Sequence, residues 1–159
     1  MITQLSLHDP DILSQLWLLQ HQAYRMESEA IGLKDAPPLT DTLESLQASP
    51  EVFFGLVTEE GELLGAVSVK KTRETSYEIT RLMVHPEHLR KGIARSLLQH
   101  VLEVLPETSD LTVTAGSRNH AAVALYQDFG FAPEQIYEPL PGVELTVYRR
   151  TWRRHAYEA

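Results

Sequence analysis

One segment, running from Ile79 to Leu98, constrains the fold of this chain more than any other. Its apolar run predicts a β-strand over 76–84, and a proline-marked loop and a Lys-Gly-Ile-Ala turn then lead into an amphipathic helix over about 90–105. Because the first turn of a helix leaves backbone N–H groups without partners, this unit would present free donors beside Arg90 and Lys91. Such a site favours a phosphate group.

Hydrophobic periodicity predicts the other elements of the chain. Asp9 or Asp11 is expected to cap the first helix, and Thr40 or Asp41 the second, with Glu44 following. The mixed stretch 25–38 contains a glycine and a Pro-Pro pair, so it predicts a loop or a broken helix. The pattern predicts strands over 2–7, 52–58, 62–70, 111–115, 131–137 and 144–149, and helices over 11–24, 39–48 and 118–129.

The connections between these elements indicate the topology. Glu59-Glu60-Gly61 is a tight hairpin signal, and three successive strands with short connections predict an antiparallel meander. The strand over 76–84 then crosses through a helix to 111–115, which predicts a parallel, right-handed connection. We therefore expect a three-layer α/β domain over residues 1–150, with a mixed, mostly antiparallel sheet of about six or seven strands and about four helices, followed by a tail over 151–159.

Composition excludes several classes of function. The chain has 159 residues and a formal net charge of −8, which argues against nucleic acid as a partner. It contains no apolar run long enough to span a membrane and no export signal, so we expect a cytoplasmic protein. It contains no cysteine, which excludes disulfides, thiolate metal sites and a cysteine nucleophile. We also expect no metal at His85-Pro86-Glu87-His88, because the proline disrupts the helical spacing of a zinc site.

Two motifs carry a family resemblance. The window Leu89-Arg90-Lys91-Gly92-Ile93-Ala94, after a strand that ends Val84-His85-Pro86, resembles the Gln/Arg-x-x-Gly-x-Gly/Ala signature of the Gcn5-related N-acetyltransferase family. The segment from Asn119 to Phe131 resembles that family's Asn-x-x-Ala-x-x-Leu-Tyr-x-x-x-Gly-Phe helix. With the strand order, the resemblance covers about 2–150. Leu89 stands where the family has Gln or Arg, so we expect weaker binding of the coenzyme.

The resemblance implies acetyl-CoA as co-substrate, an amine as acceptor, and a set of contacts. The loop Leu89, Arg90, Lys91, Gly92, Ile93 and Ala94 would bind the pyrophosphate of acetyl-CoA. Backbone groups of Met83 and Val84 would bind the pantetheine arm in the manner of an added strand, and Asn119 would contact it. Tyr126 would lie near the thioester sulfur. A homodimer through the C-terminal strands is a further expectation from the family.

Acetyl transfer to an amine requires a neutral amine, a stabilised carbonyl oxygen and a protonated leaving thiolate. We predict Tyr126 as the general acid and a backbone N–H near Met83 or Val84 for the carbonyl oxygen. Glu78 is the predicted base, and the alternative is that it forms a surface ion pair with Arg81 or Arg73. By resemblance, the acceptor pocket would involve Tyr24, Glu27, Glu29, Tyr137 and Glu138, whose carboxylates would suit a cationic amine.

Three hypotheses for function follow from these expectations. The leading one is an N-acetyltransferase that modifies the primary amine of a small molecule by direct displacement. A second is a protein acetyltransferase that acts on an N-terminus or a lysine, and a third is a non-catalytic module that binds acyl-CoA. Retention of Tyr126 favours the two enzymes over the module.

Overall fold

The computed structural model describes residues 1–30 and 41–151 of the chain. The elements follow the predicted order, and a short 3₁₀ helix over Pro86–His88 is added to them. The strands are β1 (Ile2–Gln4), β2 (Val52–Val57), β3 (Leu63–Arg73), β4 (Ser76–Val84), β5 (Asp110–Gly116), β6 (Ala132–Leu140) and β7 (Val143–Thr151), and the α-helices are α1 (Pro10–Ala30), α2 (Leu43–Gln47), α3 (Ile93–Val104) and α4 (His120–Asp128).

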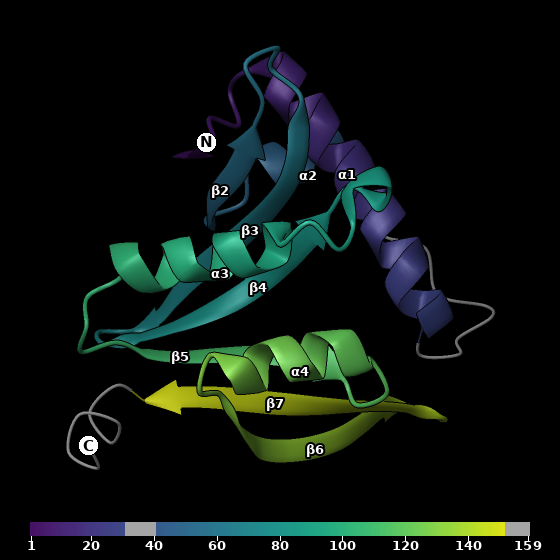
Figure 1. Ribbon diagram of the computed structural model, residues 1–159, viewed down its shortest axis with the longest axis vertical. Coiled ribbons are helices and arrows are strands. Elements are labelled where there is room, and N and C mark those ends of the chain that lie inside the picture. Colours follow the sequence, from purple (N-terminus) through teal and green to yellow (C-terminus); the bar gives the residue numbers. More distant parts are fainter. Residues whose placement is uncertain (31–40, 152–159) are drawn as a thin grey trace.

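The seven strands form one mixed sheet in the order β1-β2-β3-β4-β5-β7-β6. Neighbouring strands are antiparallel except β4 and β5, which are parallel and are joined through α3 (Figure 1). The predicted meander, the parallel crossover and the three-layer α/β fold are therefore confirmed.

Each face of the sheet is covered by its own hydrophobic core. On one face α3 and α4 pack on the sheet, with Leu97, Leu98 and Val101 of α3 fully buried. On the other face α1 and α2 contribute Leu16, Leu19 and Leu46 to a second core. The two cores leave the middle of the sheet sandwiched between helices, which fixes β4 and β5 at the centre of the molecule.

The close approach of α3 to the sheet depends on Gly65 of β3. A Cβ atom added at Gly65 would lie 2.7 Å from Cγ2 of Ile93 and 3.0 Å from the carbonyl oxygen of Met83. The first turn of α3 therefore packs directly on the β3 backbone, and this contact holds the start of the helix near the end of β4.

The first helix is longer than predicted. Residues 25–30, expected in a loop or a broken helix, continue α1 to Ala30, because no glycine or proline interrupts the chain before Gly32. The buried Ser28 hydroxyl donates to the carbonyl oxygen of Tyr24 at 2.8 Å, as a residue inside a helix can. The rest of the stretch 25–38 lies outside the described residues. The extension places Glu27 on a regular helix beside the sheet.

The predicted caps were right for α1 and wrong for α2. Asp9 accepts a hydrogen bond from the backbone N–H of Asp11 at 3.0 Å and thus caps α1. The cap of α2 is Thr42, which forms a reciprocal capping box with Ser45. The alternative cap Thr40 lies outside the described residues, and the Asp41 side chain binds Gln20 and Arg81 instead.

Most strand boundaries lie close to the predicted ones, and two hairpin strands run further. β3 continues to Arg73 and β6 to Leu140, because cross-strand backbone hydrogen bonds persist in exposed hairpins without burial. β7 ends at Thr151, the first residue of the expected tail. Residues 152–159 of that tail lie outside the described residues.

Candidate active site

The parallel strands β4 and β5 separate halfway along their length. Their pairing runs from Ser76↔Asp110 to Ile79↔Val113 and stops there, although β4 continues to Val84 and β5 to Gly116. The β3–β4 register shifts at this point, since Ile79 is opposite Val69 and Arg81 is opposite Ser68, which leaves Thr80 as an extra residue. A bulge of this kind bends its strand, and here the bend opens a gap between β4 and β5.

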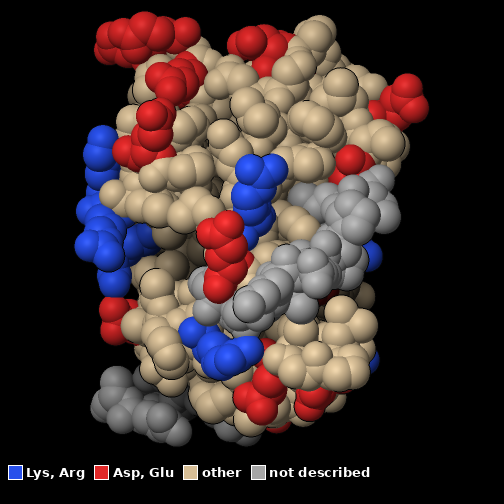
Figure 2. Space-filling model, turned by 90° about the vertical axis from the view of Figure 1, so that its right-hand side faces the viewer, with Lys and Arg blue, Asp and Glu red and all other residues tan. Residues whose placement is uncertain are grey.

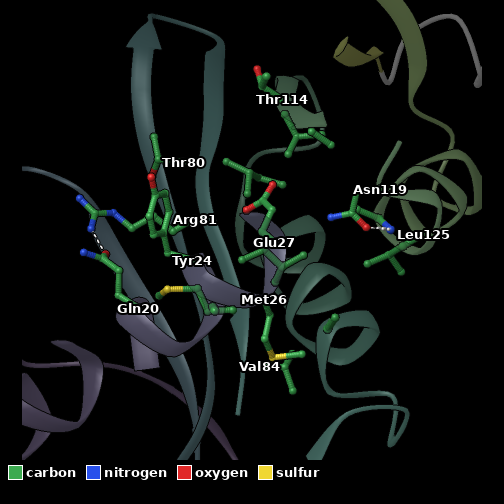
Figure 3. A pocket seen from close by; sticks show the side chains of 18 of the residues that line it. Gln20, Tyr24, Met26, Glu27, Thr80, Arg81, Val84, Thr114, Asn119 and Leu125 are labelled. Atoms are coloured by element: carbon green, nitrogen blue, oxygen red, sulfur yellow. Dashed lines mark hydrogen bonds between the residues drawn. The ribbon is translucent and has the colours of Figure 1, made fainter. Parts of the chain in front are cut away.

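A cavity of about 690 Å³ occupies this gap. Its walls come from α1, from the segments before α2 and β2, from the separated ends of β4 and β5, from the loop and first helical turn after β4, and from one side of α4 (Figure 3). The lining residues are Gln20, Ala23, Tyr24, Met26, Glu27, Asp41, Glu51, Ile79, Thr80, Arg81, Leu82, Met83, Val84, Leu89, Ala94, Val113, Thr114, Ala115, Asn119, Ala121, Ala122, Leu125 and Tyr126.

The bulge residue Thr80 is held by the neighbouring strand. Its hydroxyl lies 2.7 Å from the Ser68 hydroxyl and donates to the Ser68 carbonyl oxygen at 3.3 Å. Ser68 is completely buried on β3. These contacts fix the point at which β4 leaves β5 and so define the inner end of the cavity.

The loop after β4 presents backbone donors at the outer end of the cavity. Gly92 has a φ of 77° and stands at the N-cap of α3, where no side chain binds the free N–H groups of the first turn. Arg90 also has a positive φ, of 63°, which is unusual for a residue with a side chain. Two such positions in three residues turn the backbone sharply before the helix, which is the geometry of an anion-binding loop.

The six predicted loop residues divide into three groups. Leu89 and Ala94 line the cavity at its mouth, and the Ile93 side chain is buried in the core. Arg90, Lys91 and Gly92 are exposed and do not line the cavity. In the view of Figure 2, Lys and Arg side chains gather along one edge of the molecule, and acidic side chains lie at both its upper and its lower end.

Tyr126 of α4 is a buried tyrosine whose side chain also lines the cavity. It is 5% exposed and packs near the rings of Phe131 and Tyr148, at centroid distances of 5.8 and 6.2 Å. Within residues 1–30 and 41–151 its hydroxyl has no hydrogen-bond partner. Burial raises the pKa of Tyr126 far above its usual value, and the charge of Glu27 raises it further. The hydroxyl therefore keeps its proton and remains available as a donor.

Glu27 and Asn119 lie on opposite helices that border the cavity. The Asn119 side-chain oxygen caps α4 by accepting from the Ala122 N–H at 3.3 Å, which leaves its NH₂ group for other contacts. The Glu27 carboxylate points into the cavity (Figure 3). Glu27 is accessible to solvent through the open side of the cavity, yet the surrounding walls displace enough water that burial raises the pKa of its carboxyl group.

A polar network around Arg81 forms the α1 side of the cavity. Arg81 Nη1 lies 3.1 Å from Asp41 Oδ2, Arg81 Nη2 lies 3.1 Å from Glu51 Oε2, and Arg81 also donates to Gln20. Burial acts to raise the pKa of Glu51, but hydrogen bonds from Ser49, Thr80 and Arg81 and the charge of Arg81 outweigh it and lower that pKa. Glu51 therefore stays ionised, and the Arg81 charge is balanced by two carboxylates.

The structure thus separates the residues predicted for the acceptor and the base. Tyr24 and Glu27 line the cavity, whereas Glu29, Tyr137 and Glu138 do not. Glu78 is also outside the lining and lies between Lys70 and Thr112 in the sheet. Its alternative pairing with Arg81 is wrong, because Arg81 binds Asp41 and Glu51.

Gln20, Asp41, Glu51, Thr80 and Arg81 are lining residues that the sequence analysis missed. One local signal was present. Arg81 is a lone cation inside an otherwise largely apolar strand end, which indicates a buried partner.

The described ranges contain neither a candidate metal cluster nor a membrane-spanning helix. Over 1–30 and 41–151, no group of three or more His, Asp or Glu residues could hold a metal ion. Over the same ranges, no helix has both the length and the apolar character needed to cross a membrane.

Comparison with known proteins gives consistent results. Residues 14–131 match the family model described as "Acetyltransferase (GNAT) family". The chain is 34% identical over 148 residues to the UPF0157 protein YqkA of Bacillus subtilis, covering 93% of this chain and 43% of that protein. It is 35% identical over 101 residues to the uncharacterized N-acetyltransferase YsnE of B. subtilis, covering 61% of this chain and 64% of that protein.

A solved structure supports the same fold. The PaiA N-acetyltransferase from Thermoplasma acidophilum in complex with coenzyme A superimposes with a TM-score of 0.71 at 16% identity, covering 95% of this chain and 98% of that one. The chain spans less than two thirds of the length of the curated relatives described above. Because the family model covers most of the sequence, the chain belongs to the acetyltransferase (GNAT) family.

Proposed function

We propose that this protein is an acetyl-CoA-dependent N-acetyltransferase that modifies the primary amine of a small molecule. The observation that carries the proposal is the gap between β4 and β5, whose cavity extends from Leu89 and Ala94, which flank the open helix N-terminus at Gly92, to the buried Tyr126. A thioester coenzyme needs both an anion site for its pyrophosphate and an acid near its sulfur, and the cavity reaches from beside the Gly92 turn to Tyr126.

The coenzyme would lie along the separated end of β4. Backbone groups of Met83 and Val84 on the edge facing β5 have no strand partner there, so they are free to bind the amides of pantetheine as a further strand would. The turn at Gly92 would hold the pyrophosphate, with Arg90 and Lys91 contributing positive charge and Leu89 an apolar contact at the mouth. The Asn119 NH₂ group would donate to the pantetheine arm.

The chemistry proceeds by direct displacement. The amine nitrogen forms a bond to the acetyl carbonyl carbon, a backbone N–H near Met83 or Val84 stabilises the oxyanion, and the carbon–sulfur bond breaks. Tyr126 donates its proton to the departing sulfur and recovers one from solvent. A primary ammonium ion loses two protons in becoming an amide, one balancing the proton placed on the coenzyme thiol and the other passing to solvent.

The base in this reaction has two candidates. Glu78 stays a prediction, although it lies outside the cavity lining and would have to act through intervening water. Glu27 lines the cavity, its charge acts on Tyr126, and burial raises the pKa of its carboxyl group above the ordinary value, which is the direction that favours acceptance of a proton. We favour Glu27 on these grounds.

The test measures the thiol released from acetyl-CoA with a chromogenic thiol reagent. The protein itself gives no background signal, because it contains no cysteine. Tyr126→Phe should lower kcat by about 10²-fold or more if the hydroxyl is the acid. Tyr148→Phe is the matched control, since Tyr148 is equally buried in the same core but does not line the cavity. Equal rates for wild type and Tyr126→Phe would exclude that role.

The same assay separates the alternatives. Turnover with peptides and none with small amines would favour a protein acetyltransferase. Calorimetric binding of acetyl-CoA without turnover of small amines, peptides or proteins would favour a non-catalytic acyl-CoA-binding module.

A further inference from the structure

The charges that line the cavity are strongly unequal. Among the described lining residues, Glu27, Asp41 and Glu51 carry carboxylates, and Arg81 is the one cation. Arg81 contacts Asp41 and Glu51 at 3.1 Å each, so its charge is already balanced. The described lining residues therefore offer no free cation to a negatively charged group on an acceptor.

Glu27 differs from the other two carboxylates. Within residues 1–30 and 41–151 it makes no ion pair and no hydrogen bond, and its carboxylate points into the cavity (Figure 3). Tyr126 is a residue only 5% exposed that lines the same cavity, and its hydroxyl also has no hydrogen-bond partner among the described residues. A carboxylate and a hydroxyl without described hydrogen-bond partners thus border one cavity that has room for a ligand, and the Glu27 charge acts on Tyr126.

We propose that Glu27 binds the amino group of the acceptor, and that this cavity accepts alkylamines that carry no carboxylate beside the amine and rejects α-amino acids. The inference rests on the proposed acetyltransferase function and names its class of acceptor. An alkylammonium group of the acceptor would supply the positive charge that Glu27 lacks among the described residues. The carboxylate of an α-amino acid, which lies two bonds from its nitrogen, would meet Glu27 and the neighbouring acidic network without a compensating charge.

Glu27 would also take the first proton. The ammonium N–H bond breaks, its proton moves to the Glu27 carboxylate, and the electron pair remains on nitrogen for attack on the acetyl carbon. The protonated Glu27 side chain reaches solvent through the open side of the cavity and releases the proton there. The step needs no other reactant than the amine and acetyl-CoA.

Matched acceptors test the selectivity directly. Isoamylamine, leucinamide and leucine share one side chain and differ at the carbon beside the amine, as do phenethylamine, phenylalaninamide and phenylalanine. We expect kcat/KM for the amines and the amides to exceed that for the amino acids by about 10-fold or more. Neutral amides separate the effect of charge from that of size, because an amide and a carboxylate have nearly the same volume.

The variant Glu27→Gln tests the residue. It should lower kcat/KM for the amines by about 10²-fold and leave the Kd for acetyl-CoA within about 2-fold. Glu44→Gln makes the same change at an exposed position in the first turn of α2 and should leave both values unchanged. Calorimetric binding of the same ligands to the protein saturated with CoA gives a second readout that does not depend on turnover.

Each outcome has a definite reading. Amine binding that discriminates against amino acids and is lost in Glu27→Gln supports the inference. If such binding occurs but no acetyl group is transferred, only the proposed function is contradicted. Turnover of amino acids as fast as of their amines, or an unaffected Glu27→Gln, overturns the inference and leaves the proposed function standing. If the protein neither binds nor acetylates any amine, both the inference and the proposed function are overturned.

Discussion

Arg81 on β4 and Glu51 before β2 form a two-point contact, with Nη2 to Oε2 at 3.1 Å and Nε to Oε1 at 3.4 Å. The side chains of Arg81 and Glu51 are 20% and 9% exposed, so water screens the pair poorly. The same guanidinium lies 5.6 Å from the centre of the Phe53 ring. This contact ties the bent end of β4 to the neighbouring segment and forms one wall of the cavity.

Removing the guanidinium should therefore destabilise the fold. Arg81→Met would leave the carboxylates of Asp41 and Glu51 without a cation and should lower the free energy of unfolding by about 2–4 kcal/mol. Urea denaturation measures the change. Arg149→Met removes the exposed ion pair to Glu134 and should cost less than about 1 kcal/mol. Similar small losses in both variants would contradict a structural role for the Arg81 network.

A glycine pair separates backbone strain from ligand binding. Gly92 and Gly61 have φ values of 77° and 86°, and an added Cβ atom would meet no atom within 4 Å at either site. Gly92→Ala and Gly61→Ala should each lower stability by about 1–2 kcal/mol. Only Gly92→Ala should also weaken acetyl-CoA binding by about 10-fold or more, because its methyl group would project into the proposed pyrophosphate site. Calorimetry with both variants checks this, and equal affinities would place the pyrophosphate elsewhere.

The positive φ of Arg90 gives a prediction of opposite sign for stability. Arg90→Gly removes a strained backbone position and should leave the protein as stable as the wild type or up to about 1 kcal/mol more stable. It also removes a charge beside the proposed pyrophosphate, so acetyl-CoA affinity should fall at low ionic strength. Titrations at about 20 and 500 mM salt test both parts, since the difference from wild type should shrink at the higher salt. A salt-independent difference would mean that Arg90 acts through loop shape instead of charge.

The order and type of the elements could be predicted because each has a local signal. Alternation marks the strands, Gly61 marks the β2–β3 hairpin, and Gly92 and Pro106 mark the ends of α3. The predicted end of the first helix was too early, because the breakers that indicate a loop, Gly32 and Pro37-Pro38, lie beyond residues 25–30, which contain no glycine or proline themselves. The bulge at Thr80, which opens the cavity, could not be predicted because no glycine or proline marks it in the sequence. It depends on the contact with Ser68 across the sheet.

The two ends of the candidate site also differ in how well the sequence could predict them. The loop around Gly92 and the helix with Asn119 and Tyr126 are continuous motifs and were found. The Arg81 network joins positions 61, 40 and 30 residues apart in the sequence, namely Gln20, Asp41 and Glu51. Such contacts follow from tertiary packing of α1 against β4, and single-sequence patterns do not encode them.

The raised pKa of Glu27 predicts how stability responds to pH. The folded protein holds the Glu27 proton more tightly than the unfolded chain does, so ionisation of Glu27 opposes folding as the pH rises above its ordinary pKa of 4.5. Glu27→Gln removes this penalty and should be more stable than the wild type at pH 7, by less than about 1 kcal/mol because the carboxylate reaches solvent. The advantage should disappear below about pH 4, where Glu27 is protonated in both states. Thermal unfolding of the two proteins from pH 4 to 8 gives the curve, with Glu44→Gln as the exposed control. A variant less stable than the wild type at pH 7 would mean that the Glu27 carboxylate makes a stabilising contact and is not held ready for a ligand.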